Sequence, residues 1–216
     1  LRLTEITLVG GTPDTIWPMP LLGVRENPRF VFWLMDTQDR RIADVSDWVE
    51  SGQLTLSTDR LGGSGSITIT DPGIDWMSHR LQIVYDPGAE WADPWPLGVY
   101  LFSSPTYHLD GVRSWVEVGL LSKLVIIEEA SILGTAQIPA GSSVVEAVTE
   151  LLRGAGETRF SVTPSSKLMR EDYVFDAGQS LLTTINDLLD SIGYWALAVD
   201  GEGQFLISPY QRPESR

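Results

Sequence analysis

The sequence predicts a mostly β protein, with a β-barrel or sandwich domain followed by a small α+β domain that carries two helices. Between Phe30 and Glu129, roughly seven strand candidates are separated by turn signals, a pattern typical of barrels and sandwiches. Two amphipathic helix patterns follow, while the first residues are rich in proline and glycine. We therefore expect an irregular arm at residues 1–28, a β-barrel domain at 29–130 and an α+β domain at 131–216.

The clearest strand signal lies between residues 51 and 71, where two runs alternate apolar and polar residues. If the runs pair, all the apolar residues fall on one face and a row of hydroxyls covers the other. The glycines at 62–65 lack the following helix and lysine of a phosphate-binding loop, so we interpret them as a hairpin loop. The apolar positions are Leu54, Leu56, Ile67 and Ile69, and the hydroxyl positions are Thr55, Ser57, Ser66, Thr68 and Thr70.

The remaining strand candidates are short apolar runs bounded by turns such as Asp86-Pro87-Gly88. Three of the eight tryptophans fall in expected strands and are interpreted as core residues: Trp33, Trp115 and Trp195. The candidates in the front part of the chain are Thr4–Val9, Arg29–Asp36, Arg41–Val45, Leu81–Tyr85, Leu97–Ser103, Arg113–Leu121 and Lys123–Ile127.

Two helices are expected after residue 130. Ser143 and Glu146 fit a capping box at the start of the first helix, and Gly154 fits its end. The second helix is expected to open near Asp176 and to end at Gly193. Short strands are expected at Phe160–Thr163, Tyr194–Val199 and Gln204–Ser208.

Composition narrows the classes of function. The 216 residues carry a net charge of −14, which disfavours binding to DNA phosphates or to an anionic membrane. The chain has no cysteine and no apolar run long enough for a membrane span, and its start does not resemble a signal peptide. Because it begins with Leu1, we expect it to be a processed or trimmed part of a longer protein that continues past residue 216.

No catalytic, metal or cofactor motif is visible. The two histidines lie in separate segments, and no nucleophile-elbow or zinc-hydrolase pattern occurs. The carboxylate pairs Glu128-Glu129 and Glu171-Asp172 are more typical of a solvated surface than of a glycosidase cleft. We therefore expect a protein without a cofactor that is not an enzyme. Trp91 and Trp95, in a proline-containing loop, are candidate interface residues, with a sugar-stacking platform as the alternative.

Four segments together resemble the tail hub, or baseplate hub, proteins of long-tailed bacteriophages, which are also termed minor tail proteins. The first segment, Asp44–Asp71, contains the run G-x-L-T-L-S-T-D-R followed by S-I-T-I-T-D. The second, residues 97–102, reads LGVYLF, and the third, residues 138–141, reads IPAG. The last, Leu182–Ser208, reads as a helix, a G-Y-x-A-x hairpin and a Q-F-L-I-S strand. The resemblance covers roughly residues 28–210.

The resemblance implies a virion protein of the tail tip, made in the host cytoplasm. Tail-tube-like β-barrel domains would form a homotrimeric ring that joins the distal tail protein to the tip. DNA and the tape-measure protein would pass through the ring during ejection, with DNA not bound specifically. The hydroxyl face with Thr55, Ser57, Thr68 and Thr70 suits the wall of a water-filled channel, and the acidic charge suits a conduit that does not retain DNA.

Two other readings remain at the level of sequence. The first is a carbohydrate- or receptor-binding module of the tail tip that uses Trp91 and Trp95. The second is a fragment of a glycosidase or peptidase, for which no catalytic set is visible.

Overall fold

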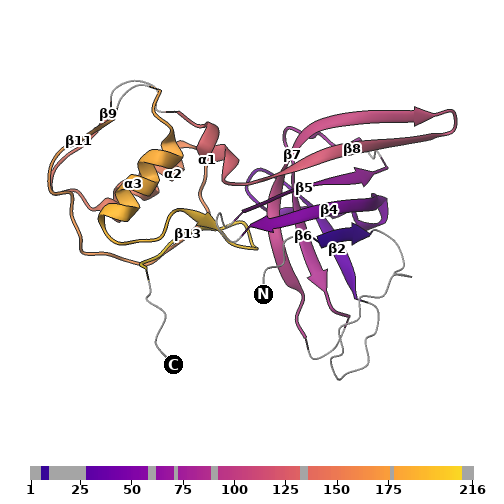
Figure 1. Cartoon of the computed structure of the whole chain (residues 1–216), viewed down its shortest axis with the longest axis horizontal. Helices are drawn as coiled ribbons and strands as arrows, with labels where there is room; N and C mark the ends of the chain where they lie inside the picture. Colours follow the sequence, from indigo (N-terminus) through magenta and orange to yellow (C-terminus); the bar gives the residue numbers. More distant parts are fainter. Residues whose placement is uncertain are drawn as a thin grey trace. The chain divides into compact units, whose positions relative to one another are not determined.

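A computed structural model describes residues 6–9, 28–57, 62–70, 73–88, 92–131, 136–175 and 178–210 (Figure 1). The chain divides into two compact units. The first, here called the sheet unit, comprises Leu1–Ser122 with the turn Gly201–Gly203, and the second, the helical unit, comprises Lys123–Asp200 and Gln204–Arg216. Of the predicted arm at 1–28, only Ile6–Val9 and Pro28 lie within the described residues, and Ile6–Val9 forms a strand as predicted.

The sheet unit is built on one eight-stranded sheet with the order β1-β4-β5-β8-β7-β6-β2-β3. All its neighbouring strands pair antiparallel, so one face can be buried while the other meets water. Its elements are β1 (Ile6–Val9), β2 (Arg29–Met35), β3 (Arg41–Asp44), the 3-10 turn η1 (Ser46–Trp48), β4 (Val49–Ser57), β5 (Gly62–Ile69), β6 (Arg80–Asp86), β7 (Trp95–Asp110) and β8 (Arg113–Ser122).

The prediction of a closed barrel is wrong for the described part of the chain, because β1 and β3, the two ends of the sheet, do not pair with each other. The sheet nevertheless encloses a single core that draws on strands from β2 to β8. Phe32, Leu54, Ile83 and Val118 are among its almost fully buried members. Local alternation determines which side chains are buried, whereas closure requires the distant end strands to meet, and no local pattern specifies that.

The glycine segment predicted as a hairpin loop is a strand from Gly62 onward, and residues 58–61 lie outside the described part. Gly65 lies opposite Leu54 in the β4–β5 register. A Cβ on Gly65 would collide with the backbone carbonyl oxygen of Gln53. The glycine is therefore needed for the close approach of β5 to β4 and not for a turn.

The helical unit packs three helices against short strands. Its buried core includes Ile127, Val148, Ile185, Leu188 and Phe205, which come from all three helices and one strand. The elements are α1 (Val125–Glu129), β9 (Ala136–Ile138), α2 (Val144–Gly154), β10 (Phe160–Val162), β11 (Tyr173–Phe175), α3 (Leu181–Ser191), β12 (Ala198–Val199) and β13 (Phe205–Ile207).

Serine caps set the starts of both long helices. Ser143 Oγ accepts a hydrogen bond from the Glu146 amide at 3.3 Å, as the capping-box prediction requires of the serine. The second long helix begins at Leu181 and not near Asp176, because Ser180 Oγ accepts from the Thr183 amide at 3.5 Å. None of the helices in the described segments is long and apolar enough to cross a bilayer.

The two units of the structure divide between Ser122 and Lys123, whereas the sequence predicted a boundary after residue 130. The short apolar run 123–127, which was predicted as a strand, contributes instead to α1, a helix that was not predicted. Ile127 is fully buried in the helical core, which ties α1 to that unit. Lys123 is buried there as well. Its Nζ lies 2.7 Å from Glu157 Oε2 and 5.0 Å from the centre of the Phe205 ring.

Candidate functional site

The candidate site is the face of β4, β5 and β8 opposite the core, where β4 and β5 place polar side chains in transverse rows. Gln53 lies opposite Ser66, and Ser66 opposite Gly119 on the next strand. In the adjoining row Thr55 lies opposite Ser64. The same strands bury Leu54, Ile67 and Val118 on their other face, so the alternation of residues fixes both faces at once.

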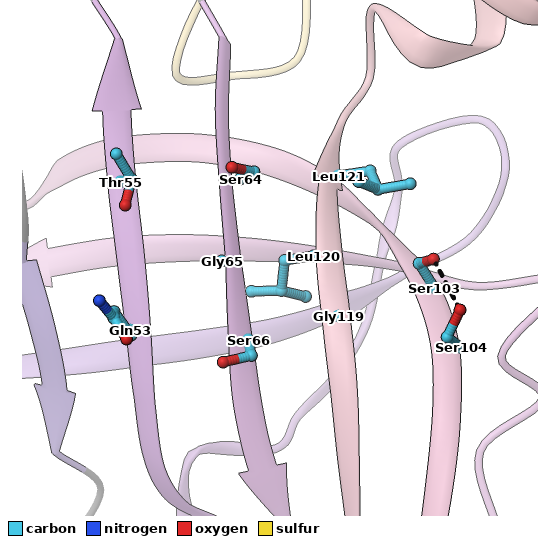
Figure 2. Close-up of a pocket in the computed structure, with 10 residues that line it drawn as sticks. All are labelled: Gln53, Thr55, Ser64, Gly65, Ser66, Ser103, Ser104, Gly119, Leu120 and Leu121. Atoms are coloured by element: carbon cyan, nitrogen blue, oxygen red, sulfur yellow. Dashed lines mark hydrogen bonds between the residues drawn. The ribbon is translucent and has the colours of Figure 1, made fainter.

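A shallow depression of about 440 Å³ lies on this face. Figure 2 shows Gln53 and Thr55 from β4 and Ser64 and Ser66 from β5 around it, with β7 and β8 at the other side. Gly119 has no side chain to fill the space between Ser66 and Ser103, and the depression extends across it. On β7, the hydroxyls of Ser103 and Ser104 lie 3.4 Å apart.

The chemistry of the depression is that of neutral hydrogen bonding. Its described lining residues offer hydroxyls and one amide but no histidine, carboxylate or amine. None of these lining residues is a general base that would activate Ser103 or Ser104 as a nucleophile. Within the described segments no group of three or more potential metal ligands occurs.

The predicted channel-facing residues have different surroundings. Thr55 is exposed at the depression, and Thr68 is half-buried beside Glu117, its cross-strand neighbour. Thr70 is exposed just past the end of β5, and its Oγ1 donates to Glu50 Oε1 at 3.2 Å. The side chain of Ser57 lies outside the described residues. Of Thr55, Thr68 and Thr70, whose side chains are described, Thr55 alone lines the depression.

Of the two candidate interface tryptophans, Trp91 lies outside the described residues. Trp95 begins strand β7 instead of lying in a loop, and its side chain is 70% exposed. The three tryptophans expected in the core are not there. Trp33 and Trp115 are half-buried with an arginine over each ring, and Trp195 is 49% exposed.

Sequence reasoning placed Ser66 on this face but missed Gln53, Ser64 and the Ser103–Ser104 pair. Ser64 follows the same period-two pattern as Ser66 and Thr68, so extending the pattern back through the glycines identifies it. Ser103 and Ser104 lie at a bulge, between Ser103 and Thr106, where the β7–β8 register shifts. Ser104 adopts a φ of 49°, which a serine rarely does, and period-two alternation does not predict that geometry.

Tyr100 on β7 is a buried titratable residue of the sheet unit. Burial raises the pKa of the Tyr100 phenol well above its usual range. The phenol donates to the Leu97 carbonyl oxygen at 3.2 Å. Tyr100 is therefore a neutral, structural side chain at physiological pH and not an acid–base group.

Comparison with solved structures places the fold among tail proteins. The tail protein from Neisseria meningitidis MC58 aligns with a TM-score of 0.54 at 10% identity, covering 85% of this chain and 52% of that one. The 43 kDa tail protein of prophage MuSo2 from Shewanella oneidensis aligns with a TM-score of 0.53 at 14% identity, covering 84% and 53%. The chain has the fold of phage tail proteins.

This likeness confirms the predicted resemblance at the level of the fold. The chain spans about half the length of the tail proteins that it matches. No family model matches the sequence, and no curated protein matches it.

Proposed function

We propose that this chain is a structural, non-enzymatic subunit of a phage tail tip that assembles as a homotrimeric hub ring. The observation that carries the proposal is the tail-protein fold together with the row of hydroxyls on β4 and β5. The ring connects the tail tube to the tip, contacts the distal tail protein and lets DNA and the tape-measure protein pass.

The polar face meets the channel in this proposal. Hydroxyls and amides bind water but carry no positive charge. A channel wall lined with them is therefore hydrated but does not bind the phosphates of DNA. The net charge of −14 adds like-charge repulsion against DNA. In this proposal Thr55 and Thr68 lie on the channel wall, and the apolar residues on the buried face of the same strands stabilise the subunit.

Mass measurement and imaging of the purified chain test the ring, and charge variants test its wall. Rings carrying Thr55→Lys with Thr68→Lys should bind a short DNA duplex at low salt and release it as salt rises. Ser161→Lys with Leu168→Lys adds the same charge at exposed positions of the helical unit and serves as the control. Equal DNA binding by the two variants would place the polar face away from the channel.

A receptor- or carbohydrate-binding module is the second candidate, and the exposed ring of Trp95 favours it. In that case Trp95→Ala abolishes binding to a glycan panel and leaves the thermal unfolding midpoint unchanged. A wild-type chain that binds no glycan on the panel removes this candidate.

A further inference from the structure

The β7–β8 hairpin extends beyond the rest of its sheet. Strand β6 pairs with β7 only as far as Leu101, and β5 pairs with β8 only as far as Val116. The two hairpin strands continue to pair up to Asp110 and Arg113, and Figure 1 shows them running past the end of β5. Residues 107–115, here called the hairpin tip, therefore have no paired strand on either side among the described residues.

One face of the hairpin tip is apolar and exposed. The exposed fractions are 61% for Tyr107, 80% for Leu109 and 102% for Val112. Tyr107 pairs with Val116, a core residue, so this face continues the buried face of the sheet into solvent. Apolar side chains held out on a projecting hairpin are typical of a contact surface.

One stack within the hairpin tip and two contacts with the rest of the sheet unit hold the tip in place. The rings of His108 and Trp115 stack at 5.1 Å with an interplanar angle of 7°. Trp76 Nε1 donates to the Tyr107 hydroxyl at 2.8 Å, and Arg113 forms an ion pair with Glu50 of β4. A surface that is already ordered loses little conformational entropy on binding.

The opposite edge of the sheet has complementary features. The outer edge of β3 has no paired strand among the described residues, and Ile42 on it is 53% exposed. Arg41, also exposed, contacts Gln82 and the Trp33 ring but forms no described ion pair with a carboxylate. At the hairpin tip, the exposed Asp110 carboxylate has no described cationic partner. Each surface thus offers an unpaired strand edge and an exposed aliphatic side chain, and Asp110 on the tip and Arg41 on the β3 edge carry opposite charges.

We propose that the hairpin tip of one copy of this chain docks on the β3 edge of a second copy. Unpaired strand edges are natural sites for strand addition, and the contact pairs Leu109 or Val112 with Ile42 and Asp110 with Arg41. Because the two surfaces differ, the contact is head-to-tail and closes into a ring when the rotation permits. The inference deepens the proposed hub ring and rests on it.

Disulfide cross-linking tests the contact directly, because the natural chain has no cysteine. Val112→Cys with Ile42→Cys should link copies into trimers under mild oxidation. The control pair Val112→Cys with Val174→Cys combines the same tip with an exposed residue of the helical unit. The first pair should link about a hundredfold faster, because docking holds the thiols at millimolar effective concentration while the free chain is at about 10 μM.

A charge swap provides the second readout. Asp110→Arg and Arg41→Asp should each slow the Val112–Ile42 cross-link, and the two together should restore its rate. Cross-linking at the control rate by a wild-type chain that still forms rings would overturn this contact and leave the hub ring standing. A chain that stays monomeric and cross-links at the control rate would overturn both. Equally fast dimerisation of Val112→Cys alone would show a tip-to-tip contact and overturn the head-to-tail one.

Discussion

In the sheet unit, strands of up to 16 residues bury one face and expose the other to water. In the helical unit, three helices pack against strands of only two or three residues. Because its strands are long and differ in length, the sheet unit exposes two surfaces, which are the polar face of β4 and β5 and the β7–β8 hairpin that extends beyond the neighbouring strands. Each unit buries an ion pair, Arg80–Asp39 in the sheet unit and Lys123–Glu157 in the helical unit. The proposed assembly surfaces lie on the sheet unit, and the helical unit is stabilised around its own core.

The largest expected effect is a loss of stability in the helical unit alone. Lys123→Met leaves Glu157 buried without its ion pair, and removing one partner of such a pair typically costs about 3–5 kcal/mol of unfolding free energy. Denaturant unfolding, followed by amide hydrogen exchange in each unit, should show the loss in the helical unit and not in the sheet unit.

The control for this prediction replaces both charges. Lys123→Met with Glu157→Leu substitutes apolar groups for the whole pair and should recover most of the lost stability. If Lys123→Met and the double variant were equally unstable, the pair would not be the reason for the loss.

A second prediction sharpens the contrast between the two faces of β5. Ile67 is 1% exposed in the core, so Ile67→Ala should lower the unfolding free energy by about 2–5 kcal/mol. Ser66, one position away, lies on the polar face and provides the matched control. Ser66→Ala should change the unfolding free energy by no more than about 0.5 kcal/mol. Equal losses in urea titrations of the two variants would contradict the assignment of the faces.

The smallest expected effect concerns pH and the turn after β2. Hydrogen bonds from the Arg40 amide, then from its guanidinium and from the Gln38 amide, lower the pKa of Asp36 below its ordinary value of 3.8. A lowered pKa means that the carboxylate favours the folded state above its unfolded pKa and loses this effect as pH falls through the folded pKa.

The unfolding free energies of the wild type and of Asp36→Asn should therefore differ at pH 6 and converge as pH falls through the folded-state pKa of Asp36, where the wild-type side chain also becomes uncharged. NMR titration of the Asp36 carboxyl measures the pKa itself. A pKa at or above 3.8 would show that the turn does not hold the carboxylate.

The sequence predicted the parts of the fold that depend on local patterns. Alternation placed Leu54 and Ile67 in the core and Thr55 on the polar face, and Ser143 predicted the start of α2. It missed features in which distant segments decide the outcome. Strand β7 was predicted to end at Ser103, but a bulge accommodates Ser104 and Pro105 and the strand continues to Asp110.

Part of the candidate site was likewise predictable from local sequence patterns, and part of it was not. The hydroxyl row on β4 and β5 follows from period-two alternation, although Ser64 was hidden among glycines that suggested a loop. The contribution of Ser103 and Gly119 depends on the register between β7 and β8, which no local pattern states. Barrel closure failed for a similar reason, because it depends on whether β1 and β3 meet.

The most direct test of the central claim is a cryo-electron microscopy reconstruction of the assembled particle that contains this chain. The hub proposal predicts three copies around a channel, with the face that carries Thr55 and Ser66 toward the channel. A copy bound singly on the outside of the particle, or a ring that turns this face outward, would contradict it.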